Sequence, residues 1–280
     1  MSDLAPPAAG IGPLLTLAVV EAIRGAARAG HASLECSLDL DRSRTTVEPG
    51  ADTFRWNGRH WPLPVAKERT VYHFADDRFM PVSRFTNSLI KLVPTEWGAP
   101  TFEIDGIKML PTAKVSPYED ARAKVELVAP KGRVVLDTCG GLGYFAAWCV
   151  VAGAREVRSF EKSADVIWLR SLNPWSPREG GALSLTHGDV RDALAGLGDA
   201  SVGAILHDPP RFGIAGELYS LAFYSELARV LERRGRLFHY TGSPNKLTTG
   251  RDVPAEVSKR LKAAGFDTEP KFDGVLAIRR

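Results

Sequence analysis

The fold of this chain is decided by one stretch, Val134-Val135-Leu136-Asp137-Thr138-Cys139-Gly140-Gly141-Leu142-Gly143-Tyr144. Apolar residues lead to an acid, then to a glycine loop, and then to a segment that reads as a helix. Gly141 and Gly143 let the backbone approach a ligand closely, and the first turn of a helix presents free N–H groups. The stretch therefore predicts a buried strand, a ligand-binding loop and a helix in succession.

The same rhythm of strand, loop and helix continues to the end of the chain. The expected strands are residues 133–136, 156–160, 183–186, 202–206 and 236–240, and the expected helices are residues 116–129, 144–152, 164–172, 218–231 and 255–264. Alternating units of this kind imply a parallel sheet with helices on both faces. Residues 266–272 and 275–279 flank Asp273-Gly274 and predict a closing antiparallel hairpin. The fold class is therefore α/β, a Rossmann-like, doubly wound, mostly parallel seven-stranded sheet.

Before Pro130 the chain has a different character. Residues 53–56 and 59–62 flank Asn57-Gly58, and residues 101–104 and 107–110 flank Asp105-Gly106. Both dipeptides tolerate the positive φ of a type I′ hairpin turn. With a helix at 13–29 and a further strand at 33–40, they predict a smaller, mainly β region. We therefore expect a loose tail at 1–12, an α+β substrate-recognition region at 13–114 and a cofactor-binding domain at 115–280.

Composition narrows the class of protein. Of the 280 residues, 44% are hydrophobic and 25% are charged, which is typical of a globular protein. The formal net charge of +3 is small for a dedicated nucleic-acid binder, so a DNA duplex is not an expected partner, although RNA stays open. The apolar residues 14–23 are too few to span a membrane. Three cysteines without a CxxC pair predict no metal site, no disulfide framework and a cytoplasmic protein.

Two cofactors fit the glycine loop. Gly141-x-Gly143-x-x-Ala146 matches the dinucleotide fingerprint, with Glu161 as the acid that binds the ribose, and this favours NAD. Asp137 favours S-adenosylmethionine (SAM) instead. Its carboxylate suits the ammonium group of an amino acid moiety and would repel a pyrophosphate. Glu161 can accept hydrogen bonds from the ribose hydroxyls of either cofactor.

Two more acids follow later strands of the expected sheet. Asp189 comes after the third strand, where it can accept the amine of an adenine. Asp208-Pro209-Pro210-Arg211-Phe212 comes after the fourth strand, and ligands of open α/β sheets bind outside such strand ends. Asp208 can accept a hydrogen bond from a nucleophilic amine, Arg211 can bind an acidic group, and Phe212 can stack on a planar substrate. The order of the four acidic segments along one sheet favours SAM.

These segments resemble the class I SAM-dependent methyltransferases, over residues 115–280. The family's pattern is an acid and a glycine loop, an acid after the second strand, an acid after the third, and [DN]PP[YFW] after the fourth. Cys139 stands where the family has its first glycine, and Arg211 stands where amino-methylating members carry an aromatic residue. The DPPR motif also resembles that of RNA uracil-5-methyltransferases, which use a late cysteine, whereas this chain has none after Cys149.

Further segments resemble a group of predicted prokaryotic methyltransferases that are similar to spermidine synthases. They are Asn173-Pro174-Trp175-Ser176, Ala215-Gly216-Glu217-Leu218-Tyr219 and Phe238-His239-Tyr240-Thr241-Gly242. The resemblance implies methyl transfer to a nucleophile, with a nitrogen favoured, and leaves an RNA base, a protein side chain or a small metabolite open as acceptor. The alternatives are an aminopropyltransferase that uses decarboxylated SAM, an NAD-dependent oxidoreductase, and a non-catalytic RNA-binding module.

The candidate site residues fall into two groups. The predicted cofactor-binding residues are Asp137, Cys139, Gly141, Gly143, Tyr144, Glu161, Lys162, Asp189 and Val190, and the predicted catalytic residues are Asp208, Pro209, Pro210, Arg211 and Phe212. Glu217, Tyr219 and Tyr224 follow the DPPR segment and are candidates to line the acceptor pocket. For the two tyrosines, ordinary packing fits equally well. His207 or His239 could act as a general base, but the sequence favours a structural role for each. Asn173-Pro174-Trp175 fits a wall of the site or a helix-ending turn equally well.

Overall fold

The computed structural model of this chain describes residues 12–213, 215–242 and 252–280. Internal contacts divide the chain into two compact units. Among the described residues, the larger unit holds Ala121–Ile167 and the chain from Pro177 to Arg280, and the smaller unit holds residues 12–120 together with Trp168–Ser176. A short segment of the second half of the chain therefore belongs to the unit formed by the first half.

The larger unit contains a seven-stranded sheet with the order β13-β12-β11-β14-β15-β17-β16. The strands are β11 (Val134–Asp137), β12 (Glu156–Glu161), β13 (Leu183–His187), β14 (Val202–His207), β15 (Leu231–Tyr240), β16 (Phe266–Lys271) and β17 (Gly274–Arg279). The pairs from β13 to β15 are parallel, and β17 pairs antiparallel with both β15 and β16. The predicted Rossmann-like sheet with its C-terminal hairpin is confirmed.

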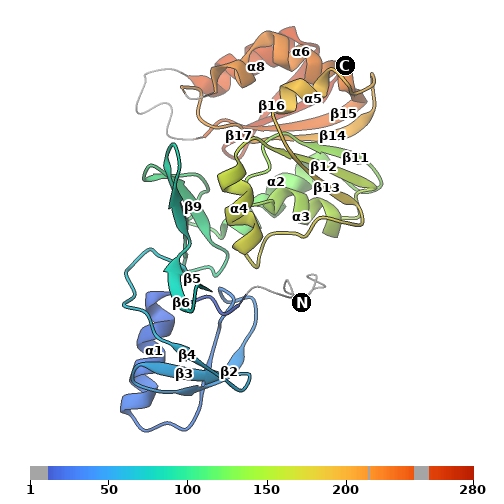
Figure 1. Cartoon of the computed structure of the whole chain (residues 1–280). Helices are drawn as coiled ribbons and strands as arrows, with labels where there is room; N and C mark the ends of the chain where they lie inside the picture. The colour runs from blue at the N-terminus through green and yellow to red at the C-terminus, as the bar shows by residue number, and fades with distance from the viewer. Residues whose placement is uncertain (1–11, 214, 243–251) are drawn as a thin grey trace. The chain divides into compact units, whose positions relative to one another are not determined.

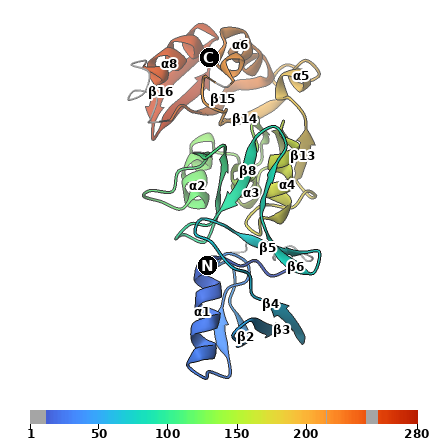
Figure 2. The ribbon, with the colours of Figure 1, turned by 60° about the vertical axis from the view of Figure 1, so that its left-hand side comes forward.

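Helices cover both faces of this sheet. They are α2 (Pro117–Val128), α3 (Tyr144–Val151), α4 (Ala164–Leu172), α5 (Val190–Leu194), α6 (Leu221–Val230) and α8 (Val253–Ala263), with the 3₁₀ helix η1 (Gly216–Tyr219) before α6. α5, α6 and α8 lie on one face, and α2 and α3 lie on the other (Figures 1 and 2). Leu136 and Ile205 of the sheet are buried in one cluster with Leu227 of α6 and Leu261 of α8. With helices on both faces, the sheet has the doubly wound arrangement that alternating strands and helices predict.

Several local predictions differ from the structure, and the strand expected at 236–240 already begins at Leu231. The helix expected at 218–231 is η1 followed by α6, because the Ser220 side chain accepts a hydrogen bond from the Phe223 N–H and starts a new helix. The last hairpin turns through Phe272-Asp273 instead of Asp273-Gly274, since Lys271 pairs with Gly274. Gly274 thus belongs to β17, where a Cβ would stand 2.3 Å from the His239 carbonyl oxygen.

The smaller unit is mainly β, as predicted. It contains α1 (Leu17–Arg28), a sheet of β1 (Leu34–Cys36), β2 (Thr45–Pro49), β3 (Thr53–Trp56) and β4 (Arg59–Pro62), the pair β5 (Tyr72–Ala75) and β6 (Arg78–Pro81), and a sheet of β7 (Ser83–Phe85), β8 (Leu89–Val93), β9 (Thr101–Ile104) and β10 (Ile107–Lys108). The strand expected at 33–40 is only three residues long. It stops at Cys36 because the Ser37 hydroxyl accepts hydrogen bonds from the Asp39 and Asp41 N–H groups and starts a turn, in which Leu40 and Asp41 adopt positive φ.

Both predicted hairpin turns of this unit are confirmed. Asn57 and Gly58 have φ of 49° and 76°, and Asp105 and Gly106 have φ of 49° and 78°. Positive φ at both central residues is the signature of a type I′ turn. The aromatic residues of the first hairpin pack into the unit's own core, where Phe54 and Trp61 are buried and Trp61 lies edge-on to Phe74 with 4.9 Å between ring centroids.

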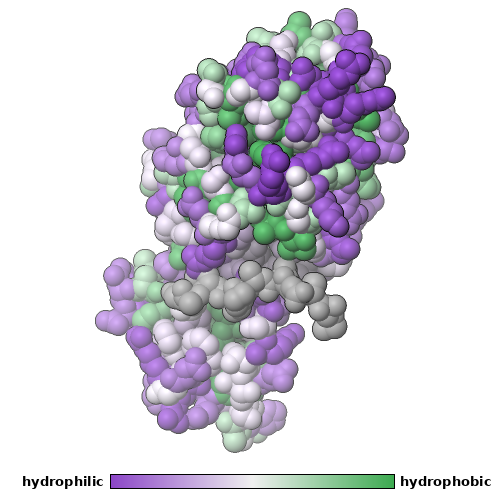
Figure 3. Space-filling model, turned by 90° about the vertical axis from the view of Figure 1, so that its right-hand side faces the viewer, coloured by the Kyte–Doolittle hydropathy of each residue, from purple (hydrophilic) through white to green (hydrophobic). Residues whose placement is uncertain are grey.

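The surface shows the mixture that the composition predicts. In the face drawn in Figure 3, hydrophilic residues are interspersed with apolar ones on both units. Within the described residues, no helix combines the length and the hydropathy needed to cross a membrane.

Candidate functional site

The candidate site lies where the order of the sheet reverses. β11 is central, with β12 and β13 on one side and β14 and β15 on the other. In open α/β sheets this reversal leaves a crevice at the carboxyl ends of the strands. The glycine loop begins directly after β11, and Asp208–Phe212 begins directly after β14. The fold therefore brings the predicted cofactor-binding and catalytic segments to adjacent strand ends.

The glycine loop is tied to both neighbouring strands. Gly141 and Gly143 have φ of 51° and 81°, which explains why glycine stands at both positions. The N–H groups of the loop donate as follows: Thr138 to the Leu206 oxygen at 3.0 Å, Gly140 to the Phe160 oxygen at 2.7 Å, Gly141 to the Glu161 carboxylate at 2.9 Å, and Gly143 to the Gly140 oxygen at 2.7 Å. Four loop amides are thus already engaged within the protein.

Asp137 is fully buried at the end of β11. Its carboxylate accepts a hydrogen bond from the Ser159 hydroxyl of β12 at 2.8 Å. The structure therefore places this acid beneath the glycine loop, against the neighbouring strand. Sequence analysis did not single out Ser159, although a polar residue on the inward face of a buried strand signals a hydrogen-bonded partner.

Glu161 ends β12 with both carboxylate oxygens oriented by backbone amides. Oε2 accepts from the Gly141 N–H at 2.9 Å, and Oε1 accepts from the Ser163 N–H at 2.8 Å. This half-buried carboxylate is therefore held in a set direction at the end of β12.

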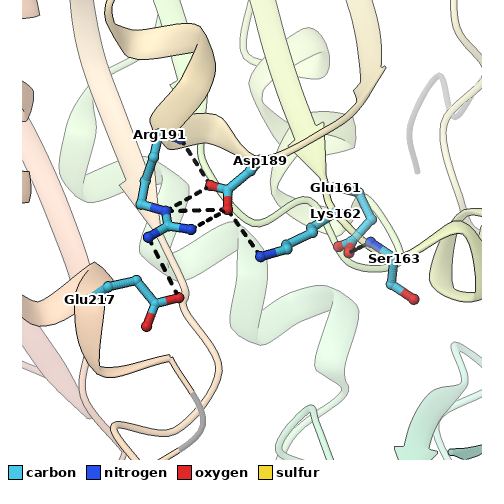
Figure 4. A network of polar contacts seen from close by, with 6 residues as sticks. All are labelled: Glu161, Lys162, Ser163, Asp189, Arg191 and Glu217. Carbon is cyan, nitrogen blue, oxygen red and sulfur yellow. Dashed lines mark hydrogen bonds and ion pairs between the residues drawn. The ribbon is translucent and has the colours of Figure 1, made fainter. Parts of the chain in front are cut away.

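Asp189 is the centre of an ion-pair network at the start of α5 (Figure 4). Its carboxylate caps α5 through the Arg191 N–H and lies 2.7 Å from the Arg191 guanidinium and 3.1 Å from the Lys162 ammonium. Hydrogen bonding to Arg191 holds the pKa of Asp189 well below its ordinary value, so the group is ionised. Arg191 in turn lies 4.0 Å from Glu217 of η1. Arg191, which the sequence did not predict, is thus the main partner of Asp189.

Cys139 lies in the glycine loop, two residues after Asp137. Burial raises the pKa of its thiol well above the ordinary value, and the carboxylates of Glu161, Asp208 and Asp137 raise it further. These three acids belong to the ends of β11 and β12 and to the segment directly after β14.

The remaining cofactor candidates are core residues. Tyr144 at the start of α3 and Val190 at the start of α5 are 4% and 3% exposed. Their side chains pack inside the larger unit, so any contact of theirs with a ligand would involve the backbone. Lys162, by contrast, has an exposed side chain.

The Asp208–Phe212 segment presents a mixed surface. Asp208 and Phe212 are half-buried, Pro209 is buried, and Pro210 and Arg211 are exposed. Phe212 lies edge-on to the buried Tyr219, with 5.3 Å between ring centroids. The segment thus offers a carboxylate and an aromatic ring directly after β14.

His207 and His239 are structural histidines, as the sequence favoured. Both are fully buried, with ring centroids 4.4 Å apart. His207 contacts the Thr138 hydroxyl at 2.6 Å and the Leu218 oxygen at 3.1 Å. Burial lowers the pKa of His207 to about 3, and burial together with His207 lowers the pKa of His239 well below its ordinary value. Neither ring is available as a general base.

Two side candidates are placed elsewhere. Asn173-Pro174-Trp175 follows the end of α4, so it forms a helix-ending turn, and it is grouped with the smaller unit. Trp175 donates its indole N–H to the Leu40 oxygen at 2.8 Å. Tyr224 is fully buried and hydrogen-bonds His239 at 2.8 Å, which excludes it from the lining of a pocket.

Solved structures share this fold. A spermidine synthase in complex with the transition-state analogue AdoDATO is 15% identical, with 72% of this chain and 75% of that chain covered and a TM-score of 0.58. The spermidine synthase from Thermotoga maritima is also 15% identical, with 72% and 74% covered and a TM-score of 0.54. The likeness to spermidine synthases that the sequence predicted is therefore confirmed for the fold.

A protein with a similar sequence shows the family to which this chain belongs. An uncharacterized protein of Methanocaldococcus jannaschii, MJ1233, is 41% identical over 221 residues, which span 77% of this chain and 76% of that protein. The chain belongs to the same family as MJ1233. No protein-family model matches the sequence.

Proposed function

We propose that this protein is a class I SAM-dependent methyltransferase that moves a methyl group to a nucleophile, most favourably a nitrogen, held at Asp208–Phe212. The observation that carries the proposal is that the sheet brings Asp137 at the end of β11, Glu161 at the end of β12 and Asp208 directly after β14 to adjacent strand ends. Carboxylates gathered at one edge of a sheet favour a cationic ligand. SAM carries two positive charges, on its sulfonium and its ammonium group.

The residues present fit SAM better than NAD. Glu161 is oriented by two amides and can accept hydrogen bonds from ribose hydroxyls. A pyrophosphate needs free amides in the glycine loop, whereas four of these amides already donate within the protein. The carboxylates of the crevice would also repel it. These contacts weigh against an NAD-dependent oxidoreductase.

The chain's own residues would assist transfer by orientation. When bound, SAM supplies an electrophilic methyl group next to a positive sulfur. Asp208 would accept a hydrogen bond from the N–H of an acceptor amine and direct its lone pair, and Phe212 would contact a planar acceptor. Arg211 would bind an acidic part of the acceptor. The rigid Pro209-Pro210 pair keeps these groups in a constant relative position.

An aminopropyltransferase that uses decarboxylated SAM is the second candidate. The fold shared with spermidine synthases and the acids at adjacent strand ends favour it. Such an enzyme must bind a polycation, however, and Arg211 stands beside Asp208 while Arg191 and Lys162 surround Asp189. These cations favour an acceptor that is not a polyamine.

Ligand-induced stabilisation tests the cofactor. We expect SAM at a hundredfold its dissociation constant to raise the free energy of unfolding by about 2.7 kcal/mol, with smaller effects of decarboxylated SAM and NAD at the same concentration. Calorimetric titration with each ligand provides the affinities. A chain that binds NAD or decarboxylated SAM more tightly than SAM would contradict the proposal.

Tritium transfer tests the reaction. The acceptors offered to wild-type protein with methyl-tritiated SAM are transfer and ribosomal RNA, a cellular protein fraction and a set of small amines. We propose that one of these three classes of acceptor takes up the label. We also propose that the smaller unit selects the acceptor and that the reaction takes place in the cytoplasm. An Asp208→Ala variant that binds SAM but keeps full turnover would remove the role assigned to Asp208.

A further inference from the structure

The Asp208–Phe212 segment is contacted by the 3₁₀ helix that follows it, η1. Tyr219, the last residue of η1, donates its hydroxyl to the Pro210 carbonyl oxygen at 3.1 Å. Its ring lies 5.3 Å from Phe212 and 5.2 Å from His239, measured between centroids. One buried side chain therefore contacts both the backbone and the aromatic ring of the predicted acceptor segment, and connects them to the end of β15.

η1 is itself fixed by the residue that ends β14. The Leu218 oxygen can only accept, so His207 donates to it through Nε2–H, and its Nδ1 accepts from the Thr138 hydroxyl. Leu218 precedes Tyr219 directly. The position of the Tyr219 ring is thus set by a buried hydrogen bond that starts one residue before Asp208.

The Tyr219 hydroxyl is suited to act as a permanent donor. The side chain is buried, and burial together with the nearby Asp208 carboxylate raises its pKa far above the ordinary value. The phenol therefore keeps its proton at neutral pH, and its hydroxyl donates to the Pro210 oxygen.

We propose that Tyr219 is a positioning residue that holds Pro210, and with it Asp208 and Phe212, in the arrangement required for transfer to the acceptor. The role in transfer rests on the proposed function. The contact between Tyr219 and Pro210 does not, so the role and the contact can be tested separately.

Tyr224 provides a matched control. It is also a buried tyrosine in the sequence that follows the segment, and its hydroxyl donates to His239 Nε2 at 2.8 Å because Nδ1 of that ring donates to the Tyr240 oxygen. Tyr224→Phe leaves a nitrogen of a fully buried ring without its donor, whereas Tyr219→Phe leaves the carbonyl of Pro210, a residue exposed at the surface. We therefore expect the control to lose more stability than Tyr219→Phe.

The first measurement is hydrogen exchange by mass spectrometry on peptides that cover Asp208–Phe212. We expect exchange there to become about fivefold faster in Tyr219→Phe, which corresponds to the loss of one neutral hydrogen bond. Tyr224→Phe should change it less than twofold despite its lower stability. Equal or smaller acceleration in Tyr219→Phe than in Tyr224→Phe overturns the proposal, because general loosening would then explain the result.

The second measurement separates positioning from cofactor binding. We expect the dissociation constant of SAM for Tyr219→Phe to stay within twofold of wild type, while the turnover number with an acceptor that wild type methylates falls about tenfold. Unchanged turnover overturns the proposal. If SAM fails to bind wild-type protein, the proposed function is wrong, and the exchange measurement still decides whether Tyr219 holds the segment.

Discussion

At the scale of the residue, the buried pair His207 and His239 links stability to pH. Each ring has a hydrogen-bond acceptor for its N–H and a hydroxyl donor for its bare nitrogen. Protonation would turn the bare nitrogen into a second donor facing a hydroxyl, inside a medium that disfavours charge. The folded protein therefore requires both rings to be neutral.

We expect the free energy of unfolding to fall as the pH is lowered from about 6.5 toward 3. Burial lowers the pKa of His207 to about 3, so below the ordinary value of 6.5 the unfolded chain binds more protons than the folded one. Each such histidine contributes a slope of up to about 1.4 kcal/mol per pH unit. Urea unfolding at pH 7.5, 6.0 and 5.0 measures it.

The control for this slope is His60, an exposed residue of β4. A His207→Gln variant should show a shallower pH dependence than wild type, and His60→Gln should show the wild-type dependence. Equal slopes for His207→Gln and wild type would mean that other groups cause the effect.

Glu161 governs cofactor affinity if SAM binds as proposed. Glu161→Gln keeps the size of the side chain but removes its charge. It also replaces one of the two carboxylate oxygens that accept from the Gly141 and Ser163 N–H groups with an amide nitrogen, which cannot accept. A charged hydrogen bond contributes about 1.5–3 kcal/mol, so we expect SAM affinity to fall at least about tenfold in calorimetric titration. Glu156→Gln, at the opposite end of β12, should leave the affinity unchanged.

At the scale of the element, Gly274 permits β17 to pair with β15. A Cβ at this position would lie 2.3 Å from the His239 oxygen and 2.7 Å from Cζ of Phe238. We expect Gly274→Ala to destabilise the protein by about 1–3 kcal/mol, because a packed strand must shift. Chemical denaturation measures the change.

Gly216 of η1 is the control for this substitution, since a Cβ there meets nothing within 4 Å. Gly216→Ala should change the free energy of unfolding by less than about 0.5 kcal/mol. If the two variants were equally stable, the close approach of β17 to β15 would be wrong.

Prediction of the elements succeeded where the pattern is local. The Asn57-Gly58 and Asp105-Gly106 turns and the order of strands and helices after Pro130 agree with the structure. It failed for Gly274 because a glycine beside an aspartate resembles a turn. Its actual constraint comes from β15, which lies more than thirty positions earlier in the chain.

At the scale of the whole molecule, Trp175 anchors Trp168–Ser176 within the smaller unit. Its indole donates to the Leu40 oxygen at 2.8 Å, and its ring lies 5.2 Å from that of Tyr118. We expect Trp175→Ala to destabilise the smaller unit by up to about 3 kcal/mol. Hydrogen exchange should then accelerate around Leu40 and in the segment itself.

SAM affinity provides the contrast for Trp175→Ala. The proposed cofactor contacts at Glu161 and around Cys139 lie in the larger unit, so we expect the dissociation constant to stay within twofold of wild type. A loss of affinity as large as that expected for Glu161→Gln would show that the smaller unit contributes to the cofactor site.

The sequence by itself determined the α/β class, the seven strands and the order of the acidic segments at their ends. These features depend on the alternation of apolar residues, on glycines with positive φ and on neighbours in the chain. Only the tertiary structure decided which backbone amides of the glycine loop already form hydrogen bonds within the protein. The glycine loop resembles a phosphate-binding loop until β12 and β14 are beside it, and then its amides are engaged by Glu161, Phe160 and Leu206. A hydrogen bond between distant segments leaves no periodic pattern in the sequence, because it depends on how the strands pack side by side.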